Sequence, residues 1–493
     1  MTFASTLGAL TSLPDVELAV DAEALGDYLC LNYVPGLKTM AQGIHRLAPG
    51  SWRLYETSGV CEETYWTARA AVLPADIKDL KTAADAVAVL LDRSVAGALR
   101  SDVPVALFLS GGIDSSLIAE SAVRQGGLDT AFCLDFREAS YSEFAGASRV
   151  ASQLDLKLER VEMTQSELGT FCEMVGHADD PLADSSALAV GCLARAVGAS
   201  YKVALSGDGG DELFGGYLTY AASALHRKMS TVLPLALRHA LQGAASLLPV
   251  SSGKVSLSYK AWRFLRAAAL PTAEAHFSWN GTWLPQDAAR LVTDHGARRS
   301  AMGSLQRMAR RHGLDDRPGL SDLQRADIGD YLANDILVKV DRMTMAYGLE
   351  SRAPFLSADL AELGLALPDR FKRAPGIGSK AVLRTLAERR FGSVTARAPK
   401  QGFGIPLHQW LRGPARPLME DLLGMESLRA IPLLDANVIA GAKARHLSGR
   451  AQLGYEMWGL MVLVAWHRIR MVRGSLAPVS AVDLPALEFP RAA

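Results

Sequence analysis

Two glycine-rich loops carry the side chains of this sequence that are best suited to chemistry. The first is the stretch SGGIDSS at 110–116, which directly follows an apolar run. Gly111 and Gly112 allow backbone N–H groups to turn toward an anion, and a helix that starts here adds the positive end of its dipole. Hydroxyl donors come from Ser110, Ser115 and Ser116. We therefore predict phosphate binding; the alternative is a plain turn whose polar side chains only cap a helix.

Carboxylates in both loops suggest a metal ion on those phosphates. The first loop lacks the lysine of a P-loop, but its Asp114 is a hard oxygen ligand of the kind that Mg²⁺ prefers. The second loop, LSGDGGDELFGGY at 205–217, places Asp208, Asp211 and Glu212 within five residues. Such a cluster repels itself unless a cation or donors neutralise it. One Mg²⁺ between Asp114 and Asp211 is the simplest neutralisation, and a solvated acidic turn is the alternative.

Strands and helices must alternate to position these loops. Apolar runs at 103–109 and 201–205 predict buried strands, and the segments 130–136 and 158–163 predict two further strands. Amphipathic or helical patterns at 79–99, 116–125 and 145–154 predict helices. This order predicts a parallel α/β sheet, which binds ligands at the carboxyl ends of its strands. Residues 51–55 predict another short strand, and the chain is mostly helical from about 218 onward.

Composition argues against several classes of protein. The chain has 493 residues, 49% of them hydrophobic, and its 52 Lys+Arg balance its 52 Asp+Glu, so net charge gives no support for a nucleic-acid partner. No apolar run reaches the roughly 18 residues of a membrane span, and the N-terminus lacks a signal-peptide pattern. The five cysteines are scattered, which is typical of reduced thiols in the cytoplasm. We expect a cytoplasmic protein without nucleic-acid or membrane partners.

Further charged residues lie outside the two loops. A helix pattern at 327–347 puts Asp335 and Lys339 four residues apart on one face. They form either a surface ion pair or a pair that orients a substrate near the second loop. Asp184 precedes a predicted helix, either as an N-cap or as part of an acceptor pocket. Arg352 is expected to anchor the 327–347 helix to the sheet.

Six stretches of the chain closely resemble the synthetase half of glutamine-dependent asparagine synthetases and of their relatives, the β-lactam synthetases and lasso-peptide cyclases. They are SGGIDSS (110–116), AFCLDFREASYSE (131–143), DDPLADSSAL (179–188), LSGDGGDELFGGY (205–217), NDILVKVDRMTMAYGLESRAPFL (334–356) and APKQGFGIPLHQWL (398–411). The resemblance spans roughly 20–425. It implies the α/β fold of the ATP-pyrophosphatase class, with a parallel sheet of the five-stranded type, a large helical C-terminal part and a small N-terminal remnant that contains β-structure.

The resemblance also implies a role for each matching position. The ATP site would comprise Leu109, Ser110, Gly111, Gly112, Asp114, Ser115, Ser116, Leu134, Ser206, Gly207 and Lys380. Leu134 would lie against adenine and Lys380 near phosphate, and Asp114 and Asp211 match the Mg²⁺ ligands. The candidate catalytic residues are Asp208, Asp335 and Lys400, of which Lys400 would stabilise the charge that develops during acyl transfer. Asp208 stands where asparagine synthetases carry Glu and β-lactam synthetases carry Tyr, which leaves the acceptor chemistry open.

The N-terminal region departs from the family pattern. Residues 1–70 resemble only the final third of a glutaminase domain, and Thr2 follows Met1 where complete enzymes carry the catalytic cysteine. We therefore expect no glutamine hydrolysis by this chain. Three nitrogen sources stay open: free ammonia, ammonia from a separate glutaminase, and an amine of the substrate. The expected domains are this truncated region at 1–70, the synthetase domain at 75–430, and a helical extension and tail at 431–493.

These features predict a carbon–nitrogen ligase that uses ATP and Mg²⁺, adenylates a substrate carboxylate and transfers it to ammonia or an amine. The alternative is an intramolecular cyclase that closes a macrolactam on a precursor peptide or a β-lactam on an amino-acid derivative. An inactive scaffold and a tRNA-thiolating enzyme are further alternatives; the intact loops count against the first and the neutral charge against the second. The carboxylate substrate is a small molecule or a peptide, and a homodimer is left open.

Overall fold

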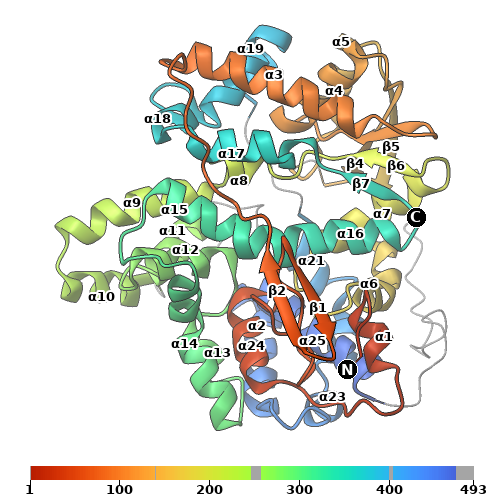
Figure 1. Ribbon diagram of the computed structural model, residues 1–493. Helices are drawn as coiled ribbons and strands as arrows, with labels where there is room; N and C mark the ends of the chain where they lie inside the picture. The colour runs from red at the N-terminus through yellow and green to blue at the C-terminus, as the bar shows by residue number, and fades with distance from the viewer. Residues whose placement is uncertain (1, 139, 246–256, 399–403, 473–493) are drawn as a thin grey trace.

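The computed structural model describes residues 2–138, 140–245, 257–398 and 404–472. Its upper part in Figure 1 is built on a sheet of five parallel strands in the order β5-β4-β3-β6-β7. The strands are β3 (Val105–Phe108), β4 (Thr130–Phe136), β5 (Lys157–Met163), β6 (Val203–Leu205) and β7 (Glu350–Arg352). The α/β class and the four strands predicted at 103–109, 130–136, 158–163 and 201–205 are confirmed, although most residues of β5 are exposed or half-buried. The polar strand β7 has no apolar run and joins the sheet through backbone pairing with β6.

Alternate residues of each strand enter different cores, because successive side chains point to opposite faces of a sheet. Val105 and Leu107 of β3 belong to the core that contains α3, α4 and α19, whereas Ala106 belongs to the core that contains α7. Burial on both faces explains why β3 and β6 are continuous apolar runs rather than alternating patterns.

Within the part of the chain that the structure describes, seven helices lie around the sheet. They are α3 (Leu80–Ala98), α4 (Ile113–Arg124), α5 (Phe144–Gln153), α7 (Ser186–Gly198), α8 (Gly210–Phe214), α17 (Ala358–Ala366) and α19 (Ala381–Phe391). The predicted helices at 79–99 and 145–154 agree with α3 and α5. The helix predicted at 116–125 begins three residues earlier, at Ile113, so Asp114, Ser115 and Ser116 form its first turn.

Below the sheet in Figure 1 lies a mainly helical part, which contains helices from both the N-terminal and the C-terminal regions of the described chain. It includes α2 (Ala22–Leu31), α6 (Phe171–His177), α14 (His295–Arg311), α24 (Ala436–Leu447) and α25 (Gly454–Arg470). α2 packs on α14, and the buried Tyr28 hydroxyl of α2 donates to the Gly459 carbonyl of α25 at 2.7 Å. The segment between the two parts comprises α16 (Leu337–Met345) and the preceding π-helical turns Asp327–Ile336.

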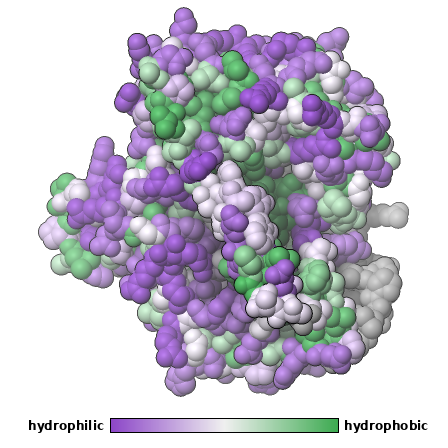
Figure 2. Space-filling view, viewed as in Figure 1, coloured by the Kyte–Doolittle hydropathy of each residue, from purple (hydrophilic) through white to green (hydrophobic). Residues whose placement is uncertain are grey.

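Two further groups of elements project from this frame. α9 (Leu218–Val232), α10 (Leu235–Ala244), α11 (Leu257–Arg266) and α12 (Thr272–Asn280) lie on the left in Figure 1. β1 (Ser51–Glu56) and β2 (Gly59–Thr64) form an exposed antiparallel hairpin, which confirms the strand predicted at 51–55. Figure 2 shows hydrophilic residues over most of the same face, interrupted by small hydrophobic patches. Among the described residues, none of the helices combines the length and apolarity needed to cross a bilayer.

Candidate active site

The first glycine-rich loop makes a sharp turn between β3 and α4. Gly111 has a φ of +71°, and a Cβ at this position would stand 2.3 Å from the Ala147 backbone nitrogen. The Gly112 N–H donates to Ser110 Oγ at 3.2 Å, and this hydroxyl lies 3.0 Å from Ser115 Oγ. Only glycine satisfies both the left-handed backbone and the close approach of α5 at position 111.

The loop's hydroxyls divide into two groups. Ser110 and Ser115 line the cavity at the strand ends. Ser116 is fully buried, and its hydroxyl donates to the Gly112 carbonyl at 2.7 Å, so it fastens the loop to its own helix. Gly111, Gly112 and Ser116 are not part of the cavity wall, and their predicted contact with ATP stays a prediction.

The second loop packs directly on the first. A Cβ at Gly210 would stand 2.7 Å from Asp114 Cγ, and one at Gly207 would stand 3.3 Å from the Ser115 nitrogen. Gly209 has a φ of +90° and leads into α8. The glycines of this loop therefore allow the loops that follow β3 and β6 to pack closely against each other.

The three acidic residues of the second loop have different partners. The Ser206 hydroxyl donates to Asp208 Oδ2 at 2.8 Å, and Lys380 Nζ lies 2.6 Å from Asp211 Oδ1. The Tyr217 hydroxyl donates to Glu212 Oε1 at 2.6 Å. Burial, and then the charge of Asp211, raise the pKa of Glu212 to about 7. The sequence cluster is therefore not one site, and Glu212 belongs to the interior.

Lys380 links the two carboxylates that were predicted to share Mg²⁺. Its ammonium pairs with Asp114 and with Asp211, and its side chain is only 5% exposed. Lys380 is also the N-cap of α19 with a φ of +56°, a strained conformation for a residue with a side chain. Gly216 makes room for the cluster, since a Cβ there would stand 1.9 Å from Asp211 Oδ1.

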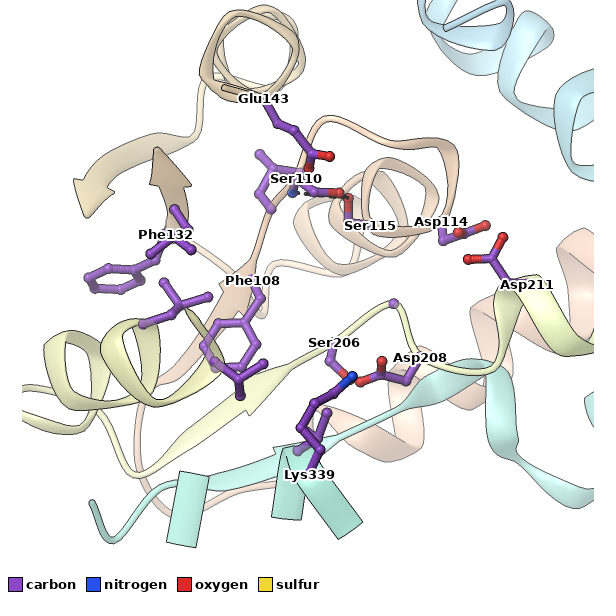
Figure 3. A pocket seen from close by; sticks show the side chains of 16 residues that line it. Phe108, Ser110, Asp114, Ser115, Phe132, Glu143, Ser206, Asp208, Asp211 and Lys339 are labelled. Carbon is purple, nitrogen blue, oxygen red and sulfur yellow. Dashed lines mark hydrogen bonds between the residues drawn. The ribbon is translucent and has the colours of Figure 1, made fainter. Parts of the chain in front are cut away.

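The same two carboxylates fit a Mg²⁺ ion that also binds phosphate. Protein sites of this kind use one or two carboxylates together with substrate phosphates, and Asp114 and Asp211 converge from the two loops (Figure 3). Within the described ranges, no group of three or more His, Cys, Asp or Glu residues could hold a metal by itself.

The cavity between the loops combines a polar end with an apolar end. Leu109, Ser206, Gly207, Asp208 and Leu134 line it as predicted. Phe108, Phe132, Val190 and Leu193 add apolar walls that suit a planar base, and Glu143 and Lys339 add charge. The sequence assigned no role to Phe108, Phe132, Val190, Leu193 or Glu143, although Glu143 ends the quoted stretch at 131–143.

A buried charged group lies beside this cavity. Lys339 Nζ pairs with Asp184 Oδ2 at 2.6 Å, and Figure 3 shows its ammonium directed toward Asp208 and Ser206. Asp335 and Lys339 are 3% and 6% exposed, so the surface ion pair considered from the sequence is wrong. Burial, and then Asp184, raise the pKa of Asp335 well above its usual range, although Lys339 opposes this. For Lys339, burial alone would lower the pKa, but the neighbouring carboxylates raise it.

Two other predicted residues have simpler outcomes. Arg352 donates to the carbonyls of Ala98 at 2.9 Å and Arg100 at 2.7 Å, so it fastens β7 to the end of α3, and its expected role in anchoring the 327–347 helix stays a prediction. Lys400 lies outside the described residues, so its predicted role stays a prediction.

Comparison with known proteins places this geometry in context. The model of the asparagine synthase family matches residues 86–468, and that of a glutamine amidotransferase domain matches residues 1–66. A putative glutamine-hydrolyzing asparagine synthetase of Mycobacterium tuberculosis is 28% identical over 489 residues, which cover 97% of this chain and 72% of the relative. Glutamine-hydrolyzing asparagine synthetase 1 of Bacillus subtilis is 27% identical over 460 residues, with coverage of 92% and 70%. Amidase chyE of Penicillium rubens is 33% identical over 207 residues, with coverage of 38% and 31%.

Proposed function

Because the chain belongs to the asparagine synthase family, we propose that it is an ATP-dependent amide ligase that adenylates a substrate carboxylate and transfers the acyl group to ammonia or an amine. The observation that carries this proposal is the convergence of Asp114, Asp211 and Lys380 from three separate segments at the ends of β3 and β6. Phosphoryl and adenylyl transfer depends mainly on positioning and on neutralised charge. This cluster supplies both.

In the first step, a carboxylate oxygen of the substrate attacks the α-phosphorus of ATP, and the bond to the β-phosphate breaks to release pyrophosphate. Asp114 and Asp211 would hold Mg²⁺, which would neutralise charge on the departing pyrophosphate. Ser110 and Ser115 line the polar end of the cavity as hydroxyl donors. Lys339 directs its ammonium toward Asp208 and Ser206, and we propose that it meets the substrate carboxylate there.

In the second step, a nitrogen nucleophile attacks the acyl carbonyl, the bond to AMP breaks, and the nitrogen loses a proton. We assign Asp208 to this second step because its side chain lines the cavity beside Ser206. Lys400 is proposed to stabilise the developing negative charge, as its match to the family implies.

The nitrogen source is proposed to be ammonia delivered by a separate glutaminase, free ammonia, or an amine of the substrate. Cys30 is fully buried, and burial raises the pKa of its thiol, so it does not offer a reactive thiolate. Cys61 lies on the exposed hairpin. The Cys30 thiol therefore gives no support for glutamine hydrolysis by residues 1–66.

Exchange of labelled pyrophosphate into ATP tests the first step. Asp114→Asn and Asp211→Asn are each expected to reduce exchange by at least 100-fold, because each removes a charge-stabilising ligand. Asp85→Asn is the matched control, since Asp85 pairs with Arg389 on the surface of α3. Retained exchange in both site variants, with unchanged circular dichroism, would contradict the proposed nucleotide site.

A further inference from the structure

A second, larger cavity adjoins the nucleotide cavity and is used by none of the steps above. It has a volume of about 770 Å³, which falls in the range of pockets for drug-sized ligands. Its walls are mostly apolar and include Ala221, Ala222 and Leu225 of α9 and Phe264 of α11. Asp184 and Asp335 line this cavity, while Lys339, the ion-pair partner of Asp184, lines the nucleotide cavity. The two cavities therefore share a wall.

Three polar side chains in the walls of the second cavity contain a buried atom without a hydrogen-bond partner among the described residues. The atoms are Thr219 Oγ1, Asn280 Nδ2 and Asp335 Oδ1. Most buried polar atoms in folded proteins are paired, and each exception asks for an explanation. These three side chains place a hydroxyl, an amide and a carboxylate in the otherwise mostly apolar wall of the cavity.

The wall of this cavity contains both acidic and basic residues, and Asp335 is the carboxylate in it that a cationic group of a ligand would meet. Its acidic residues are Asp184 and Asp335, and only the first forms an ion pair within the described residues. Among its basic residues, Arg263 donates to the carbonyls of Ser278, Trp279 and Gly281 at 2.7–2.9 Å, and Lys260 is exposed on α11. A small dicarboxylate such as aspartate would meet acidic side chains and would leave most of the apolar volume unfilled.

We propose that this cavity binds the acyl substrate of the adenylation reaction, and that the substrate is a carboxylic acid with a bulky apolar body and a primary ammonium group that pairs with Asp335. This inference rests on the proposed function, because the carboxylate must reach the nucleotide cavity past the shared wall. The same chemistry occurs in free apolar amino acids and at the N-terminus of apolar peptides.

Pyrophosphate exchange with a panel of acids distinguishes these sources. The panel contains L-aspartate, L-leucine, L-phenylalanine, the dipeptide leucyl-leucine, and the N-acetylated form of each apolar acid. We expect at least tenfold higher kcat/KM for the apolar amines than for aspartate, and at least a tenfold loss on N-acetylation. Preference for the dipeptide over the free amino acids would identify a peptide substrate, and the reverse would identify a free amino acid.

Two substitutions link that selectivity to the cavity. Ala222→Phe fills the cavity and is expected to raise KM for the apolar amines at least tenfold, whereas Ala224→Phe, on the same helix but outside the cavity wall, leaves KM unchanged. Asp335→Asn is expected to remove most of the difference between free and N-acetylated acids. If it instead lowers kcat for all acids equally, Asp335 does not bind the ammonium.

The outcomes separate this inference from the proposed function. Exchange with aspartate but not with apolar amines would overturn the inference and leave the ligase assignment intact. If no acid supports exchange, the ligase assignment fails. Calorimetric titration with leucyl-leucine and L-phenylalanine then tests whether the second cavity binds apolar amines. Binding that Ala222→Phe abolishes would support the cavity assignment, and absence of binding would overturn it.

Discussion

At the residue scale, the most informative contact is the pairing of one lysine with two carboxylates. The sequence predicted that Asp114 and Asp211 need a cation between them, and in the structure Lys380 occupies that position. The repulsion argument called for positive charge near these carboxylates, which Lys380 provides, whereas the predicted Mg²⁺ stays a prediction. It could not identify Lys380, because this residue is more than 160 positions from Asp211 in the sequence.

Lys380→Met is expected to destabilise the protein by about 3 kcal/mol, because removal of one partner leaves buried charge uncompensated. Since the freed carboxylates then bind Mg²⁺ more readily, the variant should show a larger rise in Tm with added Mg²⁺ than the unmodified protein. Differential scanning fluorimetry with and without Mg²⁺ measures both effects.

Lys372→Met is the control for that experiment. Lys372 is also fully buried, but its ammonium donates to Gln324 Oε1 at 2.7 Å and lies away from the two carboxylates. The Lys372→Met variant should be less stable than the unmodified protein but should show no larger rise in Tm with added Mg²⁺. Equal responses in the two variants would show that Asp114 and Asp211 do not form the metal site.

At the scale of single elements, the glycines of the first loop set the geometry that a ligand meets. Gly111→Ala should cost well over 1 kcal/mol and should abolish pyrophosphate exchange, because a Cβ collides with the α5 backbone in addition to the left-handed strain. Gly126→Ala is a close match: its φ of +70° is almost the same, but its Cβ would enter open space.

The Gly126 variant should lose only about 1 kcal/mol, which is the cost of the backbone conformation alone, and should keep its exchange activity. Chemical denaturation and the exchange assay together separate the strain of the left-handed backbone from the collision of the Cβ with α5. Similar losses of stability in the two variants would mean that the contact with α5 does not constrain the loop.

Elements with a strong periodic signal were predictable from the sequence, and those without one were not. The apolar runs of β3 and β4 specify buried strands directly, because both faces are covered. β7 was missed since Glu350-Ser-Arg352 carries no apolar residue. The pattern at 327–347 predicted a regular helix, whereas its first half forms π-helical turns. This winding depends on packing, and such turns are often found at functional sites.

At the scale of the whole molecule, the N-terminal region and the last described helix belong to one core. Nearly every residue of α2 and most of α25 are buried, and the two helices share the hydrogen bond from Tyr28 to Gly459. The sequence suggested a separate N-terminal remnant and a C-terminal extension because it contains no signal for contacts between distant segments. Those domain boundaries stay a prediction.

Tyr28→Phe should lower the free energy of unfolding by about 1–1.5 kcal/mol, because it leaves the buried Gly459 carbonyl without this donor. Thermal unfolding should remain a single transition if the two ends of the chain are one cooperative unit. Tyr55→Phe on the exposed hairpin should have almost no effect. A separate low-temperature transition in Tyr28→Phe would show that the N-terminal region unfolds independently.

The wall between the two cavities has a thermodynamic consequence. Lys339 contacts one cavity, and its ion-pair partner Asp184 contacts the other, so any ligand that displaces the ammonium changes the electrostatic environment of both. Occupancy on one side must then alter affinity on the other by the same factor in each direction, since coupling free energies are reciprocal. The Lys339–Asp184 ion pair would thus couple ligand binding in one cavity to ligand binding in the other.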